Sequence, residues 1–141
     1  MRKLLLVVPL LLLGCTQSGY TISVKAGSDI ATGINAGMTA IDQTRINGLI
    51  SASEELQVLG FLKYANDADA AFFSCSTAAN TAGSKAGTFT ACAMVFNSAL
   101  NNPTELALIH VSNPTAQATI NTLIQGILTG VNAVITALGG K

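Results

Sequence analysis

The chain has 141 residues, with seven lysine and arginine side chains against seven aspartate and glutamate side chains, so its formal net charge is zero. Charged residues make up 10% of the chain, well below the usual quarter, and no basic patch of the kind that binds nucleic acid is present. The polar surface must therefore come mainly from Thr, Ser, Asn, Gln and Gly.

The first fourteen residues have the layout of a secretory signal. Arg2 and Lys3 precede an apolar run from Leu4 to Leu13, and a positive segment followed by a short apolar one is typical of exported chains. Ten apolar residues span about 15 Å as a helix, roughly half of a bilayer core. The run is therefore too short for a permanent membrane span.

The apolar run ends in Leu12, Leu13, Gly14 and Cys15. This segment resembles the lipobox of bacterial lipoproteins, in which a small residue stands just before the cysteine. The resemblance implies cleavage before Cys15, a diacylglycerol on its thiol and an acyl chain, such as palmitate, on its new amine. Two or three such chains would anchor the protein stably, since each buried CH₂ contributes about 0.8 kcal/mol. The competing interpretation is an ordinary cleaved signal with an incidental cysteine.

The lipoprotein resemblance also bears on location. An Asp after the lipidated cysteine commonly retains Gram-negative members of this family at the inner membrane, and this chain has Thr16 there. We therefore expect the outer membrane if the source is Gram-negative. Residues 15–27 are expected to form the lipidated N-terminus and a tether, and residues 28–141 one folded domain.

Helical periodicity begins near Ser28 and continues to about residue 63, with apolar residues at three- to four-residue spacing. Because this stripe stays roughly in phase, we expect one continuous helix over 29–63. The alternative is a break at Asn47–Gly48, after which Ser51 and Glu54 would form a new capping box.

The middle of the chain predicts a helical hairpin. Asn66–Asp67 has the composition of a cap for a helix over 67–80, the segment 83–87 is rich in glycine and predicts a turn, and a further helix follows over 88–100.

The C-terminal third contains two copies of Asn-Pro-Thr, and each predicts a helix with Asn as the cap and Pro in the first position. The predicted helices cover 103–111 and 114–138. Within 114–138, one apolar stripe recurs at heptad-like spacing, opposite an uncharged polar stripe made of Asn121, Gln125, Thr129, Asn132 and Thr136. The whole pattern predicts an all-α fold, an antiparallel bundle of about four main helices.

Cys75 and Cys92 remain once Cys15 is lipidated, and they lie almost equidistant from the 83–87 turn. In an antiparallel hairpin such positions face each other, and an exported chain meets an oxidising compartment. We therefore expect a disulfide between them, contributing about 3 kcal/mol by the loop-entropy model. The alternative is two buried free thiols.

The sequence offers few residues that could take part in catalysis or bind a metal. His110 is the only histidine and has no carboxylate or nucleophile near it in the sequence, and Asp67 and Asp69 lack the glycine and glutamate of a calcium loop. Two cysteines and one distant histidine also lack the ligand spacing of zinc sites. We expect no catalytic residue, no metal and no cofactor.

The sequence leaves three classes of function open. We expect a non-enzymatic, membrane-anchored lipoprotein that acts by contact with an envelope or foreign component, such as a structural accessory or an exclusion or immunity factor. The first alternative is a membrane-active helical oligomer, because residues 120–138 are uncharged and just long enough to span a bilayer. The spacing of Gly126 and Gly130 also permits close helix packing in membranes. The second alternative is a binder of an apolar ligand between the helices.

Overall fold

The computed structural model describes residues 18–140, which form five helices and contain no strand. Four helices are long, and the fifth is a short helix in the connection before the last one. In chain order they are α2 (Gly19–Ile46), α3 (Ala52–Thr81), α4 (Ala86–Leu100), α5 (Pro103–Ala107) and α6 (Pro114–Ala137).

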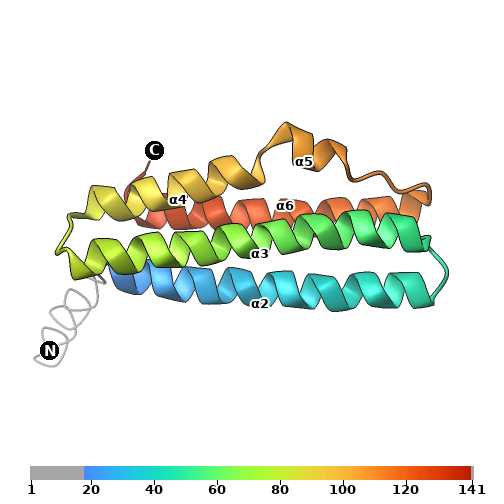
Figure 1. Cartoon of the computed structure of the whole chain (residues 1–141), viewed down its shortest axis with the longest axis horizontal. Coiled ribbons are helices and arrows are strands. Elements are labelled where there is room, and N and C mark those ends of the chain that lie inside the picture. The colour runs from blue at the N-terminus through green and yellow to red at the C-terminus, as the bar shows by residue number, and fades with distance from the viewer. Residues whose placement is uncertain (1–17, 141) are drawn as a thin grey trace, which may run out of the picture.

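The four long helices run alternately up and down (Figure 1). Helix α2 packs against α3 and α6, and α4 packs against the same two helices from the other side. Helix α5 continues in the direction of α4 before the chain reverses into α6 (Figure 1). The expected antiparallel bundle is confirmed, with both ends of the described chain at one end and the α2–α3 connection at the other.

The core forms a single cluster along the bundle axis. Each long helix contributes apolar side chains at three- to four-residue spacing, which places them on one face. Complete burial of one such side chain stabilises the fold by about 1.5–3 kcal/mol. The large apolar side chains with at most 1% exposure are Ile34, Ile41, Val58, Leu62, Leu100, Ile120 and Val131.

The prediction of one continuous helix over 29–63 is wrong, and the alternative break is the correct one. Helix α2 ends at Ile46, and Gly48 has a positive φ of 71°, a conformation that glycine adopts without strain. Ser51 then caps α3 and forms a capping box with Glu54. The two helices fold back on each other, and each buries its apolar stripe in the shared core.

Two further boundaries differ from those predicted. Helix α3 runs through Asn66–Asp67 without interruption, so no separate helix begins at residue 67. Helix α2 begins at Gly19, where the Ser18 hydroxyl accepts a hydrogen bond from the backbone N–H of Thr21. Residues 19–27, expected to belong to the tether, are therefore helical.

The predicted bounds of the C-terminal helices lie closer to the observed ones. Helix α4 begins two residues earlier than expected, and α6 ends one residue earlier. Helix α5 stops at Ala107 rather than at residue 111. The N–H groups of Leu108 and Ile109 still bond to carbonyls three residues earlier, but the next two N–H groups bond to side chains instead. His110 N–H donates to Gln57, and Val111 N–H donates to Gln117.

Candidate functional site

The predicted lipidation residue, Cys15, lies outside the described residues. It precedes Ser18, the cap of α2, by three positions. A fully extended chain covers at most about 3.6 Å per residue. A lipid on Cys15 would therefore be attached within about 11 Å of the start of the bundle.

The expected partners Cys75 and Cys92 are joined by a disulfide between α3 and α4, with their Cα atoms 5.8 Å apart. Cys92 is buried in the core, whereas Cys75 lies on the surface. The bond closes the helical hairpin near its turn, which is a structural role.

The remaining polar residues singled out from the sequence are not brought together. His110 is exposed in the segment after α5. Asp67 is also exposed, and its carboxylate lies 3.4 Å from the ammonium of Lys63 in the preceding turn of α3. Among residues 18–140, no group of three His, Cys, Asp or Glu side chains is placed to hold a metal ion.

Asp69 is an exception that sequence reasoning missed. It lies in the middle of α3 with 7% exposure. A Cβ atom added at Gly27 of α2 would lie 3.4 Å from Asp69 Oδ1, and this oxygen has no hydrogen-bond partner. Burial raises the pKa of Asp69 to about 6, because a low-dielectric environment disfavours the charged carboxylate.

A groove of about 660 Å³ lies between α2 and α6. From α2 it is lined by Ile22, Lys25, Ala26, Asp29, Ile30 and Gly33. From α6 it is lined by Leu123, Gly126, Ile127, Gly130, Ala133, Val134 and Ala137. We call this feature the α2/α6 groove. Its volume lies in the range of about 300–1,000 Å³ that is typical of ligand sites.

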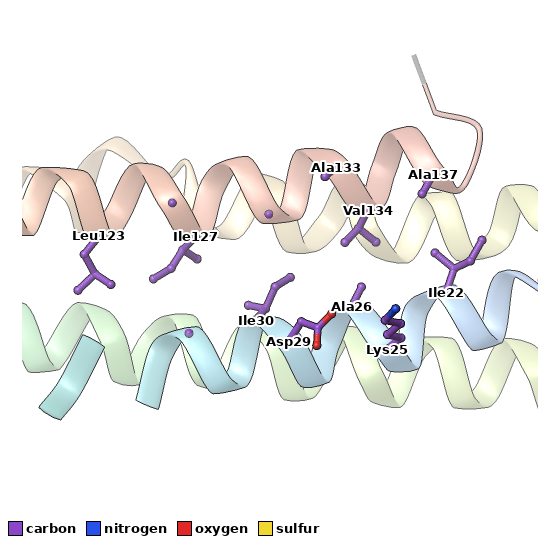
Figure 2. A pocket seen from close by; sticks show the side chains of 13 residues that line it. Ile22, Lys25, Ala26, Asp29, Ile30, Leu123, Ile127, Ala133, Val134 and Ala137 are labelled. Carbon is purple, nitrogen blue, oxygen red and sulfur yellow. The ribbon is translucent and has the colours of Figure 1, made fainter. Parts of the chain in front are cut away.

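The floor and walls of the groove are apolar. Figure 2 shows Leu123, Ile127 and Val134 pointing from α6 toward α2, and Ile22 and Ile30 pointing back from α2. Only two lining residues are charged, Lys25 and Asp29, and their formal charges cancel. The groove therefore suits an uncharged apolar occupant.

Small residues create the groove. A Cβ atom at Gly33 or at Gly126 would meet no other atom within 4 Å, so space stands open beside both. Further along α2, a Cβ atom at Gly37 would come within 2.8 Å of the Leu123 side chain, so the two helices close up there. Gly37 thus permits a close contact between the helices, whereas Gly33 and Gly126 leave open space.

Helix α6 is long and apolar enough to cross a membrane by length and composition alone, and no other helix of the described residues is. The core helix of a folded bundle passes the same test. One face of α6 is buried in the bundle, and the five residues of the predicted polar stripe are all exposed. This arrangement is the one expected of an amphipathic bundle helix.

A second apolar feature lies at the end of the bundle opposite the described N-terminus. Ile46, Leu49 and Leu56, which flank or form the α2–α3 connection, are 73%, 40% and 70% exposed. Figure 1 places this connection at the far end of α2 from Ser18. We call these three residues the tip.

Comparison of the chain with family models, with curated proteins and with solved structures found no match. The candidate sites rest on the chain's own residues.

Proposed function

We propose that this protein is a bacterial lipoprotein, held on an envelope membrane by acyl chains on Cys15, whose bundle acts without catalysis by contacting another protein. The contacted protein would be an envelope or foreign component, as for a structural accessory or an exclusion or immunity factor. The signal layout and the Leu-Leu-Gly-Cys segment support the anchor. Thr16 after the cysteine favours the outer membrane in a Gram-negative source.

The observation that carries the contact role is the position of the tip. Helix α2 has 28 residues, which corresponds to a length of about 42 Å. An anchor at Cys15 holds the N-terminal end of α2 near the membrane, so the tip would stand well away from it. Exposed apolar side chains gathered on one part of a surface mark a contact site more often than scattered ones do.

Crosslinking in the native envelope followed by co-purification tests this role. We expect a specific protein to be captured by the wild type and to be lost with Ile46→Asp or Leu56→Asp. Val95→Asp is the matched control, because Val95 on α4 is 72% exposed and lies outside the tip. Equal capture by the wild type and both tip variants would show that the tip is not the contact site.

Mass spectrometry of the mature N-terminus tests the anchor separately. We expect an acylated Cys15 as the first residue. An unmodified N-terminus at Thr16 or beyond would contradict the lipoprotein assignment without bearing on the tip.

The α2/α6 groove favours a second candidate function, the binding of an apolar ligand between the helices. Its volume and its apolar lining support this candidate. Binding of an apolar fluorescent probe by the detergent-free domain, and displacement of that probe by fatty acids, would distinguish this function from the contact role.

A further inference from the structure

We propose that the α2/α6 groove holds one of the acyl chains attached to Cys15, so that the bundle is docked onto its own anchor. This inference rests on the acylation of Cys15 in the proposed function. Three properties of the groove support it, namely its shape, its charge and its distance from Cys15.

The groove has the dimensions of a hydrocarbon chain. Along α2 it extends from Ile22 to Gly33, which at 1.5 Å per residue is about 17 Å. One leaflet of a bilayer core, which holds one layer of acyl chains, is about 15 Å thick. A single chain lying parallel to the helices would thus contact the groove over most of its length.

The charge of the groove favours an acyl chain over a lipid headgroup. Lys25 and Asp29 are one helical turn apart on α2, and their formal charges cancel. An anionic phosphate would be attracted by the ammonium of Lys25 but repelled by the carboxylate of Asp29. An uncharged acyl chain requires no charged partner.

The groove reaches the end of the bundle nearest the proposed anchor, since Ile22 near the start of α2 and Ala137 at the end of α6 both line it. Ile22 lies four residues after Ser18, about 6 Å along the helix, and Cys15 precedes Ser18 by three residues. An acyl chain covalently attached at this distance has a high effective concentration at the groove, because attachment over a short distance makes its binding intramolecular. A free phospholipid lacks this advantage.

Moving one acyl chain from the bilayer into the groove is energetically reasonable. A chain that moves from the bilayer into an apolar groove exchanges one apolar environment for another, so its CH₂ groups keep apolar contacts in both positions. The remaining two acyl chains would still provide the two signals that stable anchoring requires. A second copy of the protein is a poorer occupant, because a symmetric contact would place one concave groove against another.

Photocrosslinking of the full lipidated protein tests the proposal. Cells supplied with a diazirine-bearing fatty acid would attach it to Cys15, and mass spectrometry of the purified protein first establishes that Cys15 is acylated. After illumination we expect a crosslinked product that joins the Cys15 peptide to a groove peptide within one chain. We expect loss of this product with Gly126→Leu or Gly33→Leu, since either side chain would extend into the open space.

The matched control is Gly60→Leu on α3, another exposed helical glycine whose added Cβ would meet no atom within 4 Å. It should leave the crosslink unchanged, and cooperative melting of all variants shows that the bundle is folded. Acylated Cys15 without any intramolecular crosslink would overturn the proposal while leaving the anchor intact. A groove crosslinked to free phospholipid, or to the acyl chain of another copy in an isotopically mixed sample, would also overturn it. Unacylated Cys15 would overturn the anchor itself.

Discussion

The carboxylate of Glu54 accepts a 2.6 Å hydrogen bond from the backbone N–H of Ser112, although 58 residues separate the two in the chain. The same carboxylate accepts a 2.7 Å bond from the backbone N–H of Ser51, which completes the capping box of α3. One side chain thus stabilises the start of α3 and also attaches the connection between α5 and α6. Its hydrogen bonds from Ser51 and Ser112 lower the pKa of Glu54 to about 2, because they favour the charged form.

We expect Glu54→Gln to destabilise the fold at neutral pH and to release the 108–112 segment. Because the pKa of Glu54 is lower in the folded state, its contribution to stability is complete above its ordinary pKa of 4.5 and declines as the pH falls toward 2. The difference between variant and wild type should therefore shrink at low pH. Urea unfolding at pH 7 and pH 2.5, with hydrogen exchange of the Ser112 amide, measures both effects. Glu55→Gln, which removes only a 3.8 Å contact with Arg45, should leave the Ser112 amide protected.

Asp69 predicts a pH dependence of the opposite sign. Burial raises its folded-state pKa from 3.8 to about 6, so the folded protein retains a proton that the unfolded chain releases. Stability from this group is therefore present below about pH 4 and declines as the pH rises through 6.

Asp69→Asn removes this titration, so it should stabilise the protein at pH 7.5 by no more than about 3 kcal/mol, at 1.4 kcal/mol per pKa unit, and change little at pH 4. Thermal or urea unfolding at the two pH values measures the difference. Asp67→Asn, at an exposed position, is the control. An equal effect of Asp69→Asn at both pH values would show that the carboxyl of Asp69 does not titrate in this range.

Val131 and Asn132 are neighbours on α6 that distinguish the bundle from a membrane-inserted helix. Val131 is fully buried and Asn132 is exposed. Val131→Asp should cost several kcal/mol, enough to unfold a marginal domain, whereas Asn132→Asp should change stability by less than about 0.5 kcal/mol. Melting of residues 16–141 without detergent checks both. If α6 enters a bilayer instead, Asn132→Asp should be damaging as well.

Removal of the disulfide between Cys75 and Cys92 should lower the free energy of unfolding by about 3 kcal/mol, because the cross-link restricts the unfolded chain. A Cys75→Ser, Cys92→Ala double variant should show the same loss as reduction of the wild type, since Cys75 is exposed and Cys92 is buried. Non-reducing peptide mapping checks the bond itself. Full labelling of both thiols in unreduced, denatured protein would contradict it.

The features that the sequence predicted well depend on local interactions. Asn113 followed by Pro114 begins α6 because the Asn side chain accepts hydrogen bonds from two free backbone N–H groups of the first turn. The apolar stripe of α6 lies in the core because its spacing matches one face of a helix. Cys75 and Cys92 meet because an antiparallel hairpin pairs positions equidistant from its turn.

Where local signals competed, tertiary packing decided the outcome. Asn66–Asp67 has the composition of a cap, yet α3 continues through it, because Phe61, Leu62, Ala65, Asp69 and Phe72 form one continuous buried face. The break at Gly48 follows from the same cause, since α2 and α3 bury their apolar faces only after the chain reverses.

The sequence by itself determined the helical class and the caps Asn102 and Asn113, because each of these depends on residues that are close together in the chain. Only the tertiary structure decided the burial of Asp69 and the presence of the α2/α6 groove. The width of that groove depends on the distance between helices that are about a hundred residues apart in the chain. Gly37 brings the helices together against Leu123, while Gly33 and Gly126 leave the adjoining space open. In the sequence, Gly37 looks no different from Gly33 or Gly126. The helices are in close contact at Gly37 because the Leu123 side chain faces it, and they leave a hollow where no side chain faces the glycine.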